Sequence, residues 1–139
     1  MPQLKIVLDT NCLLQSISRR SSYALAIDRL MESAYELYIT NDILLEYDEK
    51  ISENFSKETA ELIISALSLL QNVKKIDAYF QLNLIPADPD DNKFADCAFA
   101  GNVHYLVTND KHFNILKSVA FPVINVINLD EFKTLLSSL

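Results

Sequence analysis

The sequence predicts an α/β fold in which a mostly parallel central sheet lies between two layers of helices. Short apolar segments rich in β-branched residues alternate with amphipathic segments of helical length. The first apolar segment, 4–9 (LKIVLD), stays apolar up to a terminal acid, which is typical of a strand buried on both faces. Parallel strands joined by right-handed helical crossovers place helices on both faces of the sheet. A three-layer α/β/α sandwich with Rossmann-like organisation follows.

The spacing of apolar residues predicts the elements after this strand. Segment 23–34 is expected to be a helix and 36–40 (ELYIT) an alternating strand. Asn41 is a suitable cap for a helix that runs to about Phe55. The inner face of the first helix is expected to contain Tyr23, Ile27, Leu30, Met31 and Ala34.

The next helix is expected to begin at the cap residue Ser56. Its inner face is predicted to consist of Leu62, Ile63, Ala66, Leu69 and Leu70.

The C-terminal half continues the alternation. The run 88–90 (DPD) is a turn signal before a helix over 91–100, which Gly101 is expected to end in a left-handed conformation. Segments 104–108 (HYLVT) and 122–127 (PVINVI) are expected strands, and 130–139 is a closing amphipathic helix.

No linker, repeat or low-complexity tract divides the 139 residues, so a single domain over 1–139 is expected. Half of the residues are apolar, which excludes a disordered chain. Because no secretory or membrane-spanning segment is recognisable, we expect a cytoplasmic protein without a membrane partner. Cys12 and Cys97 lack the spacing of a metal site and are expected to be reduced and at least partly buried.

Three acids are expected at the carboxyl-terminal edge of the sheet. Asp9 closes the first strand, Asp110 follows segment 104–108, and Asp91 opens the helix before that strand. Ligands bind at this edge in parallel sheets. Converging carboxylates repel unless a proton or a divalent cation neutralises them, and oxygen ligands favour Mg²⁺ or Mn²⁺. Taken singly, each acid is equally consistent with an ordinary cap or turn.

Helical phase ranks the acids of segment 91–100. Asp91 falls on the same arc as Phe94, Ala95 and Ala98, so its carboxylate is expected to face the sheet. Asp96 falls nearly opposite and is expected to face solvent.

The helix over 41–55 offers a fourth acid. Glu46 and Asp48 flank its apolar stripe on either side, and periodicity does not choose between them. Glu46 is alternatively a simple helical pair with Lys50. The stripe consists of Ile43, Tyr47 and Ile51.

Four ordered segments resemble the PIN-domain family, in particular toxin components of bacterial toxin–antitoxin pairs (VapC-like). They are 5–15 (KIVLDTNCLLQ), 42–49 (DILLEYDE), 88–101 (DPDDNKFADCAFAG) and 104–113 (HYLVTNDKHF). In the resemblance, Glu46 rather than Asp48 matches the family's second acid. Asp91 matches the third acid, and Thr108 and Asp110 match a T-x-D arrangement.

The resemblance implies a metal-dependent endoribonuclease that cleaves single-stranded RNA with one or two Mg²⁺ or Mn²⁺ ions. It further implies an antitoxin protein as partner and allows a homodimer. Asn11 and Thr108 are candidates to orient the carboxylates by hydrogen bonds, and ordinary turn capping is the alternative interpretation of both. Asp90 or Asp96 is an alternative to Asp91 because the acid-rich run leaves the register open. The implied metal ligands are Asp9, Glu46, Asp91 and Asp110.

Two alternatives compete with this interpretation. The first is a catalytically inactive PIN-like module that binds RNA or protein, although unpaired carboxylates kept together without a metal would cost stability. The second is a phosphatase of the haloacid-dehalogenase type, whose second acid would fall where this chain has Asn11.

The net charge of −7 argues at first against a nucleic-acid partner. The acids that cause it are concentrated in the candidate segments, so the remainder of the chain is balanced in charge. We therefore expect RNA binding to depend on a cation more than on a basic groove. The seven acids are Asp9, Glu46, Asp88, Asp90, Asp91, Asp96 and Asp110.

Overall fold

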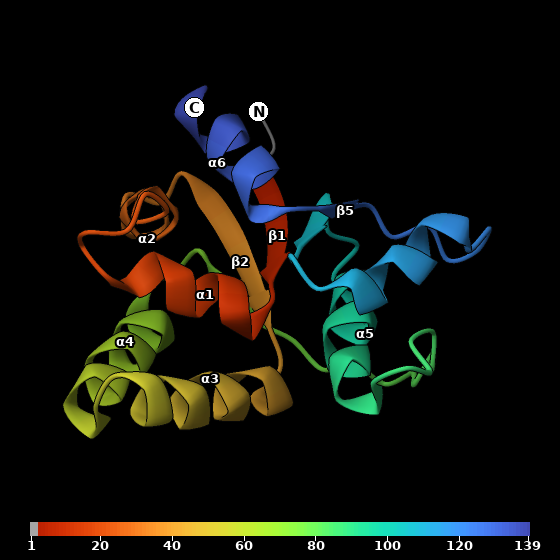
Figure 1. The fold of residues 1–139 in the computed structure, drawn as a ribbon, viewed down its shortest axis with the longest axis horizontal. Helices are drawn as coiled ribbons and strands as arrows, with labels where there is room; N and C mark the ends of the chain where they lie inside the picture. The colour runs from red at the N-terminus through yellow and green to blue at the C-terminus, as the bar shows by residue number, and fades with distance from the viewer. Residues whose placement is uncertain (1–2) are drawn as a thin grey trace.

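A computed structural model describes residues 3–139, which form a five-stranded sheet. Helices flank this sheet (Figure 1). All strand pairs are parallel, in the order β3-β2-β1-β4-β5. The order reverses direction at β1, which places β1 and β4 side by side at a topological switch point. The strands are β1 (Leu4–Leu8), β2 (Tyr35–Ile39), β3 (Val73–Lys75), β4 (Tyr105–Val107) and β5 (Val126–Ile127).

Six α-helices and two 3-10 helices connect and cover the strands of the described residues. Helix α3 follows β2, and the short helix η1 leads directly into α5. The α-helices are α1 (Thr10–Ile17), α2 (Leu25–Met31), α3 (Asn41–Asn54), α4 (Lys57–Leu69), α5 (Asn92–Ala100) and α6 (Leu129–Ser137), and the 3-10 helices are η1 (Pro89–Asp91) and η2 (Lys111–Ser118).

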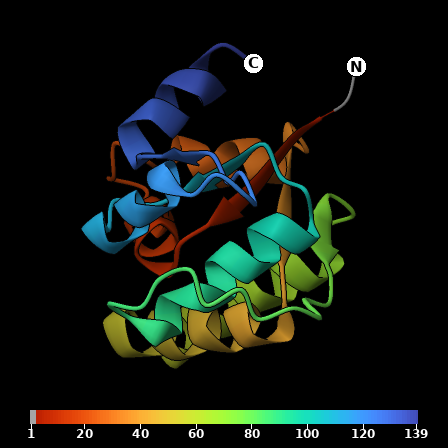
Figure 2. The same cartoon turned by 90° about the vertical axis from the view of Figure 1, so that its right-hand side faces the viewer.

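The helices form layers on both sides of the sheet. Helices α1 and α2 lie on one side of β1 and β2, and α5 lies on the other (Figure 1). The view in Figure 2 shows α5 crossing in front of the sheet, where it contacts β1, β2 and β4. Helices α3 and α4 pack against each other at the end of the sheet where β2 ends. The predicted three-layer α/β fold is confirmed.

The core sits where the predicted apolar stripes meet. Ile6, Val7 and Leu8 of β1 are fully buried, as expected for the central strand of a parallel sheet. In α3 the predicted stripe is confirmed. Phe94, Ala95 and Ala98 of α5 are buried as well, and both cysteines are free and buried.

Helices α1 and η2 and strand β3 have no counterpart among the elements predicted from the sequence. Helix α1 begins directly after Asp9, and its apolar residues Cys12 and Leu13 are buried beside the polar Ser16. Strand β3 is a three-residue edge strand with an exposed Lys-Lys pair, so it lacks an apolar pattern. Helix α1 and strand β3 are stabilised mainly by contacts with distant segments rather than by local pattern.

The predicted inner face of α4 is only partly correct: Ile63 and Leu70 pack against the core, but Leu62 and Leu69 do not. Leu62 is 73% exposed and Leu69 is 82% exposed, whereas the buried residues are Ala60 and Leu67. Helix α4 packs on α3 and offers several apolar residues on more than one arc. Periodicity therefore did not decide its orientation.

Two helix ends also differ from expectation. Thr40, not Asn41, caps α3, because its hydroxyl accepts a hydrogen bond from the Ile43 N–H. Gly101 ends α5 in a right-handed conformation, and the left-handed residue is Asn102, with φ 48°. Glycine is needed at 101 for space, since a Cβ there would lie 2.8 Å from the Tyr38 ring.

Two predicted elements are shorter in the structure. The strand expected over 122–127 is regular only at β5, and the helix expected over 23–34 is regular only at α2. Met31, expected on the inner face of that helix, is 53% exposed. Among residues 3–139, no helix combines the length and the apolar character needed to cross a membrane.

Candidate active site

The predicted acids come to one end of the sheet from four segments. Asp9 follows β1, and Asp110 lies just beyond the end of β4. Asp91 ends η1 at the start of α5, and Glu46 lies in the first half of α3. Parallel strands end at the same edge, so the topology alone brings Asp9 and Asp110 together.

Thr108 joins the residues that follow β1 and β4. Its hydroxyl donates to Asp9 Oδ2 at 2.7 Å and accepts from the Asp110 N–H at 3.0 Å. Asp9 lies at the N-cap position of α1. One buried hydroxyl therefore orients the Asp9 carboxylate and fixes the backbone of Asp110.

Asp9 lies in an environment that disfavours its charge. Burial raises the pKa of its carboxyl group, while the Thr108 hydrogen bond and the Asn11 backbone N–H lower it. The negative charges of Asp110 and Glu46 raise the pKa further. The negative charges of these three carboxyl groups therefore interact across the site.

Glu46 has two partners from other segments. The Thr10 hydroxyl donates to Glu46 Oε2, and Lys93 Nζ lies 2.8 Å from Glu46 Oε1. The helical pair with Lys50 is not formed, because Lys50 contacts Glu53 at 3.4 Å instead.

Asp91 carries the unpartnered oxygen of the site. Its Oδ2 atom is buried and has no hydrogen-bond partner among residues 3–139. Burial raises the pKa of Asp91 to about 7, with further contributions from the charges of Asp88, Asp110 and Asp9. His112, whose Nδ1 lies 3.7 Å from Asp91 Oδ2, lowers it. An orphaned carboxylate oxygen of this kind is suited to a cation.

One cluster in the described part of the chain brings three potential ligand atoms within 4.8 Å of one another. It consists of Asp88, Asp91 and His112, whereas the other predicted ligands Asp9, Glu46 and Asp110 are not in it. His112 Nδ1 also lies 3.5 Å from Asp110 Oδ1. His112 therefore lies beside both Asp91 and Asp110, whereas Lys93 lies beside Glu46.

The remaining predicted site residues have other surroundings. Asn11 is exposed, and its backbone N–H rather than its amide group acts on Asp9. Asp90 is exposed, and its backbone N–H donates to Asp88 Oδ1. Asp96 is half-buried rather than free in solvent, because its carboxylate accepts the Leu82 N–H at 3.0 Å. Helical phase separates Asp96 from Asp91, but it does not predict that the loop at Leu82 covers Asp96.

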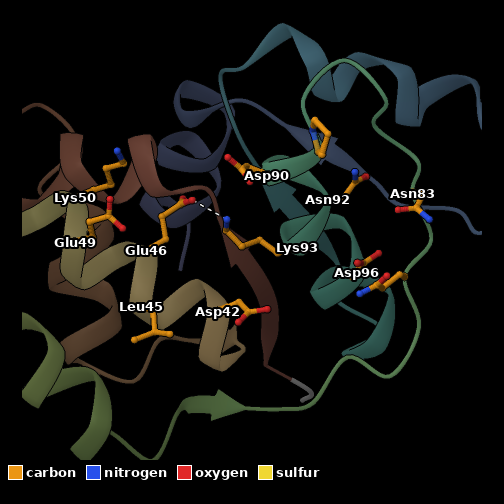
Figure 3. A pocket seen from close by; sticks show the side chains of 12 residues that line it. Asp42, Leu45, Glu46, Glu49, Lys50, Asn83, Asp90, Asn92, Lys93 and Asp96 are labelled. Atoms are coloured by element: carbon orange, nitrogen blue, oxygen red, sulfur yellow. Dashed lines mark ion pairs between the residues drawn. The ribbon is translucent and has the colours of Figure 1, made fainter.

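A cleft of about 610 Å³ runs beside the acids between α3 and α5 (Figure 3). Lys93 reaches from α5 toward Glu46 on α3, and this ion pair bridges the two walls (Figure 3). The loop before η1 forms part of the remaining wall. The lining residues are Asp42, Leu45, Glu46, Glu49, Lys50, Gln81, Asn83, Pro89, Asp90, Asn92, Lys93 and Asp96.

Sequence reasoning did not assign four residues that contact the site acids in this way. Asp88 was treated as part of a turn, and it does cap η1, yet it also faces Asp91. Thr10 lies next to Asp9 in the sequence, which was the available signal. Lys93 and His112 each lie two residues after a predicted acid, but their contacts with Glu46 and Asp91 join distant segments and leave no periodic signal.

Comparison with known proteins agrees with this architecture. The family model described as PIN domain matches residues 5–112. No curated protein sequence matches the chain significantly.

Solved structures are similar in fold at low sequence identity. VapBC2 from Rickettsia felis, bound to a DNA fragment from their promoter, has a chain 21% identical with a TM-score of 0.58, which covers 90% of this chain and 98% of its own. VapBC-1 from nontypeable Haemophilus influenzae is 15% identical with a TM-score of 0.61, covering 91% and 99%. The PIN domain endonuclease Utp24 is 13% identical with a TM-score of 0.53, covering 92% and 86%. The family model spans most of the sequence and includes all four predicted acids, and the chain belongs to the PIN domain family.

Proposed function

We propose that this protein is a metal-dependent endoribonuclease that cleaves single-stranded RNA and acts as the toxin of a toxin–antitoxin pair. The observation that carries the proposal is the buried, unpartnered Oδ2 atom of Asp91 among the charges of Asp88, Asp110 and Asp9. A divalent cation would supply the missing partner and neutralise the surrounding carboxylates. Membership of the PIN domain family supports nuclease chemistry.

The oxygen-rich donor set fits Mg²⁺ or Mn²⁺, with Asp9, Glu46, Asp91 and Asp110 as proposed ligands. When bound, such an ion lowers the pKa of a coordinated water and stabilises the leaving oxygen of a phosphodiester. The protein's own residues set the geometry for this chemistry. Thr108 holds the Asp9 carboxylate and Thr10 holds that of Glu46, so neither carboxylate has to be ordered at the moment of reaction.

The charge of the cleft bears on how RNA would bind. The cleft wall carries acids from α3 and α5 and only two lysines, Lys50 and Lys93. A polyanion therefore gains little from this surface without a cation. We infer that RNA binding, like cleavage, requires the divalent ion.

The proposed antitoxin partner is supported by the fold similarity to chains of VapBC structures. We infer a homodimer in addition, because Leu62 and Leu69 on α4 are exposed apolar residues that an interface would cover. Size-exclusion chromatography with light scattering tests the dimer, and co-purification with the product of a neighbouring small gene tests the antitoxin. A monomer at micromolar concentration contradicts the first inference, and two proteins that elute separately contradict the second.

The decisive experiment compares the purified protein with Asp9→Asn on labelled single-stranded RNA. Wild type should cleave with Mn²⁺ or Mg²⁺ and stop when a chelator is added, and Asp9→Asn should be inactive because it loses the charge at a candidate ligand. A duplex of the same sequence and a single-stranded DNA serve as substrate controls.

The outcomes separate the competing functions. Equal cleavage by wild type and Asp9→Asn would indicate a contaminating nuclease and would contradict the assigned site. RNA binding without cleavage at any metal concentration would favour the inactive PIN-like module. Faster cleavage of DNA than of RNA would overturn the substrate class while leaving the metal site in place.

A further inference from the structure

Lys93 pairs with Glu46, the α3 carboxylate proposed as a metal ligand, in a contact that the proposed reaction does not require. Its Nζ atom lies 2.8 Å from Glu46 Oε1, and this ion pair joins α5 to α3. Figure 3 shows the two side chains pointing toward one another across the cleft. Glu46 is one of the proposed metal ligands, so a cation of the chain itself stands at a site meant for a divalent ion.

The contact is held from both sides. The Thr10 hydroxyl donates to Oε2 of Glu46, and Lys93 contacts the other oxygen, Oε1. The Lys93 ammonium lies 5.7 Å from the centre of the Phe94 ring. Each of the paired side chains is only 22% exposed, so water screens the attraction less than at an ordinary surface pair.

We propose that Lys93 is an internal counter-ion that competes with the divalent cation for Glu46. This inference rests on the proposed metal site. In the metal-free protein Lys93 neutralises Glu46, which would otherwise be a partly buried carboxylate among other acids. Binding of the divalent ion at Glu46 then requires displacement of the ammonium, so part of the binding free energy is spent on breaking the ion pair. The released ammonium remains in the cleft beside the site.

The chain provides a matched control in Lys50. Lys50 lines the same cleft and carries the same charge, but it pairs with Glu53 rather than Glu46. Lys50→Gln therefore removes one positive charge from the cleft without freeing Glu46. Any difference between Lys93→Gln and Lys50→Gln reports the specific contact rather than the net charge.

The experiment measures Mn²⁺ binding by titration calorimetry in the absence of RNA, so the readout is independent of catalysis. Lys93→Gln should bind Mn²⁺ about five- to tenfold more tightly than wild type, because Glu46 is no longer occupied. Lys50→Gln should change the dissociation constant by less than about twofold. Lys93→Met, which keeps the length of the side chain over Phe94, should behave like Lys93→Gln. Circular dichroism establishes that each variant is folded.

A double-mutant cycle tests whether Lys93 acts through Glu46. In a Glu46→Gln background, Lys93→Gln should no longer tighten Mn²⁺ binding. If the tightening persists in that background, Lys93 acts by general charge and the proposal is overturned.

Failure of the proposal is distinguishable from failure of the metal site. If wild type binds Mn²⁺, Asp9→Asn weakens the binding, and the two lysine variants match each other, only the counter-ion role is overturned. If wild type and Asp9→Asn both fail to bind Mn²⁺, the proposed metal site and the counter-ion role fall together.

Discussion

The site has a strand edge, where β1 and β4 end and the Thr108 hydroxyl holds Asp9, and a helical edge between α3 and α5, where Glu46 accepts from the Thr10 hydroxyl and also faces the Lys93 ammonium. Asp9 accepts from Thr108, and the backbone of Asp110 is fixed by the same hydroxyl. On the helical side, Glu46 pairs with Lys93, and Asp91 Oδ2 is buried without a hydrogen bond.

This difference indicates which part of the site has its geometry set before an ion binds. Hydrogen bonds from a strand end persist whether or not an ion is bound, so the strand edge is a fixed template. The helical edge holds a replaceable counter-ion and an unsatisfied oxygen, both of which change when a cation arrives. Substitutions on the two edges should therefore affect stability in opposite directions.

The largest expected effect belongs to Asp91→Asn on the helical edge. Loss of the charge should reduce metal-dependent RNA cleavage about a thousandfold. The same variant should be more stable than wild type in chelator at pH 8, by about 1–2 kcal/mol after allowance for solvent screening, because a charge is removed from among Asp88, Asp110 and Asp9. Cleavage assays and urea unfolding measure the two effects. A variant that loses both activity and stability would contradict the comparison.

Thr108→Val on the strand edge should show losses in both measurements. The substitution keeps the shape but leaves Asp9 Oδ2 and the Asp110 N–H without their shared partner. We expect cleavage to fall about ten- to a hundredfold and the free energy of unfolding to fall by about 1–2 kcal/mol. Thr108→Ser, which retains the hydroxyl, is the matched control and should recover most of both. Unchanged activity in Thr108→Val would show that the hydrogen bond does not position Asp9.

The free energy of unfolding should depend on pH through the titration of Asp91 at the helical edge. The folded protein keeps the Asp91 proton up to its raised pKa of about 7, whereas the unfolded chain releases it near the usual value of 3.8. The folded state therefore binds more protons between these values, and its free energy of unfolding falls as pH rises through that window.

The expected fall is about 1–2 kcal/mol after solvent screening, in metal-free buffer. Urea unfolding between pH 4.5 and 8 measures it. Asp91→Asn should flatten the profile, and Mn²⁺ should reduce the loss at high pH. A wild-type profile that rises with pH over this window would contradict the assignment.

The smallest expected effect on RNA cleavage is that of a substitution at Asp96, five residues after Asp91. Asp96→Asn keeps an oxygen that accepts the Leu82 N–H, so cleavage should stay within about twofold of wild type. Kinetics beside Asp91→Asn would settle the register of the acid-rich run. A loss comparable to that of Asp91→Asn would move the proposed ligand to Asp96.

Much of the fold was predictable because burial leaves a pattern in the sequence. The strand β1 is buried on both faces and is therefore continuously apolar, and the α3 stripe repeats with helical spacing. The edge strand β3 and the orientation of α4 were not predictable. Strand β3 has no fully buried face and therefore no apolar pattern, and α4 has apolar residues on more than one arc of the helix.

The candidate site divides in the same way. The sequence by itself determined that Asp9, Asp91 and Asp110 lie at one edge, because parallel strands end together and a helix phase is regular. Only the tertiary structure decided that Lys93 pairs with Glu46, that His112 stands beside Asp91, and that an oxygen of Asp91 is left without a partner. Such contacts join segments whose separation in the sequence carries no periodic signal, and they form only where packing brings their side chains within a few ångströms.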